Sequence, residues 1–468
     1  MGTRGIVGAA AYLPHRRLDR TTIAAVAGGG GGKGTRSVAS YDEDTTTMGV
    51  EAARAALRGL PGGAASIDGL WFSTVAPAYA DKTNATTVHA ALRLGAATPA
   101  FDANGSVRSA TGALRAALAG EGTQLVVSAD LRSGLAGGPD EAAFGDGAAA
   151  LAVGGADDAG GAPLLAELIG VGSATEEFLD RWRAPGQARS KVWEERFGET
   201  RYVPLGVAAW EDALKASGLV ADQVDHVAIA GPHGRANAAL AKKLAVGDRG
   251  VGDHAATVGN LGSAQPGFLL IAALEQAGPG QVIALVSLAD GADVLLLRTT
   301  EAVAAWRSPH PVADQAVGGA PIPYGTYLRW RGVLPAEPPR RPEPARPSAS
   351  AAGRSGDWKF GFVGSAGDTG EVHLPPQPAD TSAVPMADAT GTVVTFTIDR
   401  LAYSPSPPVV FAVVDFDGGG RLPVELTDVD LDQVRTGARV ELTFRKLFTA
   451  DDIHNYFWKA KLLSGGDV

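Results

Sequence analysis

Two kinds of segment alternate along most of this chain, and their order restricts the fold more than any other feature of the sequence. Short apolar runs have the length of one buried strand, and the segments between them repeat apolar residues at i, i+3 and i+4, as amphipathic helices do. The pattern predicts an α/β fold in which helices cover both faces of a sheet. We expect strands at residues 5–12, 69–74, 124–129, 148–153, 224–230 and 282–288, and helices at residues 45–57, 86–94, 109–118, 207–217, 237–244 and 267–276.

A weak internal repeat indicates that the α/β unit is duplicated. Residues 144–153 read FGDGAAALAV and residues 288–297 read LADGADVLLL, so each segment places an Asp-Gly turn before a strand. A repeat of this kind predicts two related halves, which we place at residues 1–160 and 161–333.

A change of composition divides the chain after the second half. Residues 334–356 are rich in proline and then in small residues, and this composition predicts an extended linker. In residues 357–468 we expect strands of period two at 391–400, 409–415, 421–426 and 439–444, and aromatic residues follow at Tyr456, Phe457 and Trp458. About five strands in so short a region predict a small closed barrel such as an OB-fold.

Charge and cysteine content exclude several classes of function. The chain has 468 residues, a formal net charge of −10 and no cysteine. An acidic chain lacks the basic surface that phosphate backbones require, so we expect no nucleic acid partner. The absence of cysteine excludes disulfides, cysteine-ligated zinc and thiolate nucleophiles. No window approaches ~20 consecutive apolar residues, and the first apolar run is too short for a signal peptide, so we expect a cytoplasmic protein that does not contact membranes.

Several motifs resemble those of one enzyme superfamily. They are FGDGAAALAVG at 144–154, GPHGRAN at 231–237, VGNLGSAQP at 258–266, and the segments at 40–57 and 79–92. As a set they are similar to the thiolase superfamily, in particular to 3-hydroxy-3-methylglutaryl-CoA synthases and the third class of ketoacyl-ACP synthases. The resemblance implies a duplicated five-layer α/β/α/β/α fold and a coenzyme A thioester as substrate or ligand.

The resemblance also shows which reacting groups this chain has lost. The family's nucleophile is a cysteine at a helix start, where the helix dipole lowers its pKa, and Val107 occupies that position here. The glutamate that acts as general acid and base in the synthases corresponds to Val75. The histidine and asparagine that form an oxyanion site correspond to His233 and Asn260, and both are present. The usual condensation through an acyl-enzyme is therefore chemically excluded.

Other polar residues are weaker candidates for a role in the site. Ser106 and Ser109 flank Val107 and would serve as alternative nucleophiles beside His233, although small polar residues at a helix start are mostly caps. Exposed cations are usually only solvated, but the ones near the family's site are candidates to bind the phosphates of coenzyme A. These candidates are Arg16, Arg17, Lys33, Arg36 and Arg235.

The aromatic segment at residues 181–202 is better explained as an insertion than as a cofactor site. It contains Trp182, Trp193, Phe197 and Tyr202 among charged residues. We expect it to pack over the mouth of the acyl tunnel or against a partner.

The region after the linker resembles the OB-fold domain that accompanies thiolases and hydroxymethylglutaryl-CoA synthases, usually behind a zinc ribbon. Ala366 and Thr369 stand where the first two cysteine ligands belong, so we expect a ribbon that keeps its shape without metal. In the family this domain bridges subunits, which implies a multi-enzyme assembly with a thiolase-family partner.

Three functions remain compatible with the sequence. The first is an acyl-CoA-binding protein that acts with a thiolase-family enzyme in C–C bond formation or cleavage. The second is a stand-alone, thiol-independent retro-aldolase or decarboxylase that holds an enolate with His233 and Asn260. The third is a non-catalytic scaffold. For all three we expect a homodimer through residues 1 to about 330, because the apolar strand at 124–129 is an aggregation hazard unless it pairs across a dimer axis.

Overall fold

A nine-stranded sheet forms the centre of the computed structural model, which describes residues 3–156 and 158–463. Antiparallel pairing of β1 with β8, at Gly5 with Glu167 and Ile6 with Ala166, joins the two halves. The order is β11 (His226–Ala230), β12 (Val282–Leu288), β13 (Ala292–Thr299), β8 (Ala166–Ala174), β1 (Arg4–Tyr12), β7 (Gly147–Gly155), β6 (Gln124–Asp130), β4 (Gly69–Ser73) and β5 (Ala100–Asp102).

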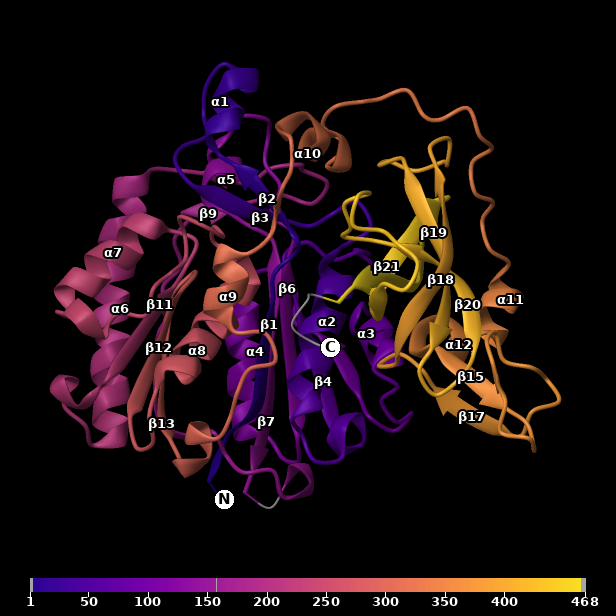
Figure 1. Ribbon diagram of the computed structural model, residues 1–468. Helices are drawn as coiled ribbons and strands as arrows, with labels where there is room; N and C mark the ends of the chain where they lie inside the picture. Colours follow the sequence, from indigo (N-terminus) through magenta and orange to yellow (C-terminus); the bar gives the residue numbers. More distant parts are fainter. Residues whose placement is uncertain (1–2, 157, 464–468) are drawn as a thin grey trace.

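The sheet and its helices form five layers (Figure 1). Side chains alternate between the faces of β6, so Val127 packs with one outer helix layer and Val126 packs with the central layer. This arrangement is the duplicated α/β/α/β/α fold that the sequence predicts. The outer layer of the first half contains α2 (Thr45–Arg58) and α3 (Ala85–Ala91), the central layer contains α4 (Arg108–Ala119) and α8 (Gln265–Gln276), and the outer layer of the second half contains α6 (Glu195–Ser217) and α7 (Gly234–Lys243).

Strand β8 was not expected, and its glycines explain why. The β8 sequence AELIGVGSA has no run of large apolar residues. A Cβ at Gly172 would lie 1.9 Å from the Ala209 carbonyl oxygen, and a Cβ at Gly170 would lie 2.8 Å from that of Ala213. These glycines therefore let the backbone of α6 approach the sheet closely. Helix α6 also begins twelve residues before the expected start at 207, at Glu195.

The expectation that residues 124–129 form an exposed edge is wrong. Strand β6 pairs in parallel with β4 and antiparallel with β7, so both of its hydrogen-bonding edges are occupied within the chain. The edge strand of this half is β5, whose Phe101 side chain is 50% exposed.

Short elements surround the strand ends at the top of the sheet in Figure 1. They are α1 (Thr21–Ala27), the three-stranded sheet of β14 (Ala320–Pro321), β2 (Arg16–Asp19) and β3 (Thr35–Val38), α5 (Pro139–Ala143), the pair β9 (Arg181–Trp182) and β10 (Lys191–Val192), α9 (Val312–Val317) and α10 (Tyr324–Trp330).

The C-terminal region is the closed five-stranded barrel expected from its period-two strands, with an unexpectedly long last hairpin. A small sheet and two short helices precede the barrel. The barrel strands are β18 (Thr390–Asp399), β19 (Val409–Phe416), β20 (Arg421–Leu426), β21 (Arg439–Ala450) and β22 (Ile453–Leu462), and the preceding elements are α11 (Ala349–Arg354), α12 (Gly356–Gly361), β15 (Val363–Ala366), β16 (Val372–His373) and β17 (Ser382–Pro385).

The barrel packs directly on the outer helices of the first half (Figure 1). Buried apolar residues of α2, α3 and the barrel form one continuous cluster. Polar contacts cross the same interface: the Tyr456 hydroxyl donates to Asp44 at 2.7 Å, and the Phe444 amide donates to Glu51 at 3.1 Å. The barrel is thus part of one packed body. Within the described ranges, no helix is both long and apolar enough to cross a membrane.

Candidate functional site

The start of α4 is where the family's nucleophile would lie. Val107 is half-buried at the residue before α4, with helical dihedral angles (φ −58°, ψ −34°). The Ser106 hydroxyl accepts a hydrogen bond from the Arg108 amide at 3.1 Å and contacts Asp290 at 3.2 Å. Ser109 contacts the Asn104 carbonyl at 3.3 Å. Both hydroxyls therefore bind the helix start or an acid, and neither contacts His233 in the way that a Ser-His nucleophile requires.

A buried aspartate at the end of β6 holds two further loops beside this helix start. One oxygen of Asp130 accepts the Val75 amide at 2.8 Å and the Thr74 hydroxyl at 2.9 Å. The other oxygen accepts the Ser263 amide at 2.7 Å. The loop that contains Val75 and the loop that contains Asn260 are thereby fixed to the same strand end.

His233 lies at the start of α7 with a defined ring orientation. Its Nδ1 accepts a hydrogen bond from the Ala236 amide at 3.1 Å, so in the neutral ring the hydrogen is on Nε2. A Cβ at Gly198 of α6 would lie 2.8 Å from Nε2 and 2.4 Å from Asp180 Oδ1, so both atoms border one point of α6. His233 is therefore oriented as a donor through Nε2.

Asn260 is anchored to the strand end that precedes His233. Its Nδ2 donates to the Gly231 carbonyl at 2.8 Å, and its Oδ1 accepts from the Gly262 amide at 2.9 Å. Asn237 donates to the same Gly231 carbonyl at 2.9 Å. An amide nitrogen carries two hydrogens, so Asn260 retains one Nδ2 hydrogen that these contacts do not use.

A chain of polar groups, which the motif analysis did not identify, runs from buried Asp180 and Tyr202 beside His233 to exposed Asp290 at the start of α4. Burial raises the pKa of Asp180 against the opposing effect of His233, and Tyr202 hydrogen bonds to this carboxyl. The Asp290 amide donates to the Tyr202 hydroxyl at 3.3 Å, and Asp290 contacts Ser106. No motif marks Asp180 in the sequence, and Tyr202 was expected only to pack in an insertion. The contacts therefore add Asp180, Tyr202 and Asp290 to the candidate site.

The aromatic insertion covers this site only in part. Tyr202 is buried and its ring centre lies 6.0 Å from that of His233. Trp182 and Trp193 contact each other across the β9–β10 pair at 6.2 Å, and Trp193 is 63% exposed. Arg183 of the same segment donates to the Val75 carbonyl. The insertion thus borders the site and leaves an apolar surface open.

Three of the five cations proposed for coenzyme A differ in whether their charge is available to a ligand. The expectation that Arg36 binds a phosphate of coenzyme A is wrong. Its side chain is fully buried, pairs with Asp146 at 3.1 Å and lies over the Tyr327 ring, so it supports the fold. Lys33 is exposed in a glycine-rich loop. Arg235 is exposed beside His233 and pairs with Glu199 at 3.0 Å.

Hydrogen bonds to Asp380 connect β15 and β16 in the segment that resembles a zinc ribbon. Ala366 ends β15, and the neighbouring Ser365 hydroxyl donates to Asp380 at 2.5 Å. His373 Nδ1 lies 2.8 Å from the same carboxylate oxygen. Among the residues for which the structure gives positions, no three His, Asp or Glu side chains are grouped to hold a metal ion.

Comparison with known proteins identifies both parts of the chain. The family model of the C-terminal OB-fold domain of ChsH2 matches residues 383–445. The hydroxymethylglutaryl-CoA synthase of Methanothermobacter thermautotrophicus is 30% identical over 346 residues, which cover 70% of this chain and 99% of that protein. The enzyme of the same name from Methanopyrus kandleri is 28% identical and covered over 97% of its length.

Solved structures show the same fold at lower identity. PksG, an HMG-CoA synthase from Bacillus subtilis, has a TM-score of 0.60 at 17% identity and covers 70% of this chain and 89% of its own. MvaS, solved in complex with 3-hydroxy-3-methylglutaryl coenzyme A, has a TM-score of 0.57 at 23% identity and covers 74% of this chain and 95% of its own. The sequence match over almost the whole length of the archaeal synthase shows that this chain belongs to the hydroxymethylglutaryl-CoA synthase family and that an OB-fold domain follows its synthase-like part.

Proposed function

We propose that this chain binds an acyl-CoA or another acyl thioester without forming an acyl-enzyme, and that it acts with a separate thiolase-family enzyme in forming or cleaving a C–C bond beside the thioester. Its relatives are named hydroxymethylglutaryl-CoA synthases, and MvaS was solved with a coenzyme A thioester, which supports this ligand class. A covalent intermediate on cysteine is excluded because the chain has none.

The proposal is supported by the orientation of two hydrogen-bond donors, His233 and Asn260, which are anchored at the same strand end. His233 has its hydrogen on Nε2 because Nδ1 accepts from Ala236, and Asn260 has an Nδ2 hydrogen beyond its bond to Gly231. Two such donors stabilise the negative charge that develops on a thioester carbonyl oxygen when an enolate or tetrahedral species forms. This chemistry requires no thiol.

Restoring the nucleophile tests whether a thioester reaches this site. Val107→Cys places a thiol at the start of α4, where the helix dipole favours the thiolate. After incubation with acetyl-CoA, intact mass should show one added acetyl group on this variant. Ser350→Cys, in the exposed segment before the ribbon, is the matched control for acylation of an ordinary thiol.

Equal labelling of the two cysteine variants, or none on a folded Val107→Cys variant, would remove the support for a thioester site at α4. Adding His233→Ala to Val107→Cys should slow acetylation, because the ring donor then no longer stabilises the reacting oxygen. The parent chain should remain unlabelled.

We further propose a homodimer through the synthase-like part and a thiolase-family partner. The exposed edge strand β5 supports the dimer, because an unpaired edge with an apolar side chain favours pairing with a second copy. The partner is tested by purification from the native host followed by mass spectrometry, in which a thiolase-family enzyme should be recovered in stoichiometric amount. Its absence at low and moderate salt would contradict the assembly.

A non-catalytic scaffold is the second candidate, and one observation favours it. The cavities described in this structure, of about 910, 660 and 170 Å³, are lined by residues other than Val107, His233 and Asn260. His233 is 8% exposed. A chain that gives no heat of binding with acetyl-CoA and no labelling of Val107→Cys would be a scaffold.

A further inference from the structure

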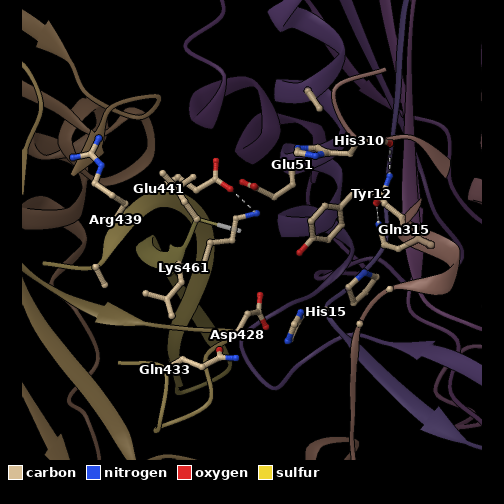
Figure 2. A pocket seen from close by; sticks show the side chains of 18 of the residues that line it. Tyr12, His15, Glu51, His310, Gln315, Asp428, Gln433, Arg439, Glu441 and Lys461 are labelled. Carbon is tan, nitrogen blue, oxygen red and sulfur yellow. Dashed lines mark hydrogen bonds and ion pairs between the residues drawn. The ribbon is translucent and has the colours of Figure 1, made fainter. Parts of the chain in front are cut away.

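The largest of these cavities lies between the synthase-like part and the barrel, away from the candidate acyl site. Its volume is about 910 Å³, and its walls come from the end of β1, from β2 and α2, from the segment before β14, and from β21 and β22. Figure 2 shows Glu441 and Lys461 on the barrel side, opposite Tyr12, His15 and Gln315. Helix α2 packs on the face of the sheet opposite α4, so this cavity is separate from the start of α4.

The carboxylates that line this cavity are already engaged in ion pairs. Glu51 pairs with Arg54 at 2.9 Å, Asp428 pairs with Arg445 at 2.6 Å, and Glu441 pairs with Lys461 at 3.1 Å. Each carboxylate therefore has a cation beside it, although Arg445 is shared with Asp42 and Glu43, and none of the three is paired with Arg17, Arg58 or Arg435 among the described residues.

Arg17 is the most unusual of those cations, because it is buried with no carboxylate at ion-pair distance in the described part of the chain, although Glu43 acts on it from farther away. Its side chain is 7% exposed, and its guanidinium donates only to the carbonyls of Pro14, Arg16 and Gln315. Within the described ranges no carboxylate lies at ion-pair distance from Arg17, and its Nε has no hydrogen-bond partner. Burial lowers the pKa of Arg17 to about 10, so the group is still charged at neutral pH.

Gly319 makes room for this guanidinium. The residue has a φ of +104°, and a Cβ there would lie 2.9 Å from Arg17 Cγ and 3.1 Å from Cζ. Any side chain at this position would be strained and would press on Arg17. The segment before β14 is thus shaped around a buried positive charge.

Two more cations of the wall are weakly paired or unpaired. Arg58, which is 41% exposed, has one carboxylate at ion-pair distance among the described residues, Asp388 at 4.0 Å. Arg435, in the loop between β20 and β21, has no ion pair in the described part of the chain. Together with Arg17, these residues give the cavity an excess of positive charge on three of its walls.

Two histidines supply neutral hydrogen-bonding groups. Burial lowers the pKa values of His15 and His310 from their ordinary range, so both rings are neutral at physiological pH. Both rings line the cavity, and their ring nitrogens have no described hydrogen-bond partner. A neutral imidazole can donate through one nitrogen and accept through the other.

We propose that this interdomain cavity binds a phosphate-bearing small molecule of nucleotide size. Guanidinium groups match phosphate geometry, and Arg17, Arg58 and Arg435 would compensate its charge. His15 and His310 would hydrogen bond to its polar groups. The volume is within the range of small-molecule sites, which occur preferentially between domains. Because both parts of the chain line the cavity, the ligand would also stabilise the docking of the barrel. This proposal does not depend on the acyl site.

Calorimetry with three probes tests the site: adenosine 3′,5′-bisphosphate, coenzyme A and inorganic phosphate. The full chain should bind the bisphosphate more tightly than inorganic phosphate. Arg58→Gln/Arg435→Gln should weaken that binding at least about tenfold, since a charge-assisted hydrogen bond is worth about 1.5–3 kcal/mol. Both arginines lie near the surface, so the variant should keep its fold, which circular dichroism checks.

Two controls separate this site from the acyl site and from general charge effects. Arg346→Gln removes an exposed arginine paired with Asp451 outside the cavity and should bind like the parent. His233→Ala should also leave bisphosphate binding unchanged. The proposal would be overturned if the bisphosphate did not bind saturably, or if inorganic phosphate bound with equal affinity. It would also be overturned if His233→Ala lost bisphosphate binding while the double arginine variant kept it.

Discussion

At the level of single residues, the proposed site combines two valines with polar groups of fixed orientation. The resemblance assigns Val75 and Val107 to the family's acid and nucleophile positions, and the Val75 amide donates to Asp130 at 2.8 Å. His233 and Asn260 keep defined orientations. Valines at these positions beside oriented donors would agree with the proposal of a site that holds a thioester and does not acylate itself.

Glu43 gives a pH dependence that can be measured. It is buried at the interface with the barrel, accepts the Tyr12 hydroxyl at 2.5 Å and lies 3.1 Å from Arg445. Burial, opposed only in part by Arg445, raises the pKa of Glu43 from 4.5 to about 7. The folded chain therefore binds a proton that the unfolded chain releases, and the stability due to this proton is lost as pH rises through about 7.

We expect the melting temperature of the parent to fall from about pH 4.5 to about pH 7 and to level off above about pH 8, with a total contribution of at most about 3 kcal/mol from Glu43. Glu43→Gln should reduce this slope, whereas Glu441→Gln, at a partly exposed ion pair, should leave it unchanged. A slope that is the same in all three proteins would show that Glu43 does not titrate in this window.

Asp42 changes the stability of the fold at lower pH than Glu43 and with the opposite sign, so the contributions of the two residues can be measured separately. Burial opposes its ionisation, but Lys459 and Arg445 outweigh that effect and lower its pKa to about 2. Its contribution is present above the ordinary aspartate pKa and is lost as pH falls toward about 2.

At the level of elements, glycines decide how closely helices approach the site. Gly198 of α6 lies against Asp180 and His233, and Ala in its place would put a Cβ 2.8 Å from the His233 ring. Gly112 of α4 has no atom within 4 Å of its would-be Cβ. Both glycines are inside helices, where replacement by Ala normally stabilises by about 0.5–1 kcal/mol.

The two glycines should therefore respond to the same substitution with opposite signs. Gly112→Ala should raise the melting temperature, and Gly198→Ala should lower it because the methyl group displaces His233 or Asp180. Differential scanning calorimetry measures both. Stabilisation by Gly198→Ala would mean that α6 does not press on the ring.

The ribbon gives a second prediction at this level. Asp380 holds Ser365 and His373 where metal ligands would cross-link the strands, so protein purified without a histidine tag should contain well under one zinc per chain. Elemental analysis measures this, and EDTA should not change the melting temperature. Asp380→Ala should lower it, because both partners lose their acceptor. Stoichiometric zinc that survives dialysis would contradict a metal-free ribbon.

At the level of the whole molecule, structure that depends on local sequence patterns could be predicted, and packing between distant segments could not. Periodicity predicts most strands of both halves, and motifs predict His233 and Asn260, because both signals lie within short segments. The hydrogen bond from the Phe444 amide to Glu51 of α2 joins residues 393 positions apart, and no local sequence pattern predicts it. Strand β8 could not be predicted from hydrophobic periodicity for a different reason. Its glycines allow close packing of α6 and interrupt the apolar pattern of a strand. Asp180 acquires its role only from burial beside His233.

Assembly is the property on which the whole-molecule picture can be tested most directly. Strand β6 is paired on both sides, so it cannot pair with a second copy. The proposed dimer interface is therefore β5, at the edge of the sheet. Phe101 is 50% exposed on that strand and packs on Trp71 at 5.3 Å, which gives the edge an apolar surface. Edge strands of this kind pair with a second copy unless a charge prevents it.

Light scattering at micromolar concentration should report a dimer for the parent chain. Phe101→Asp puts a charge on the edge and should give a monomer with unchanged circular dichroism. Val220→Asp, at a side chain that is 62% exposed beyond the end of α6, should remain dimeric. A monomeric parent would remove the dimer altogether, and a dimeric Phe101→Asp variant would mean that the copies associate through another surface.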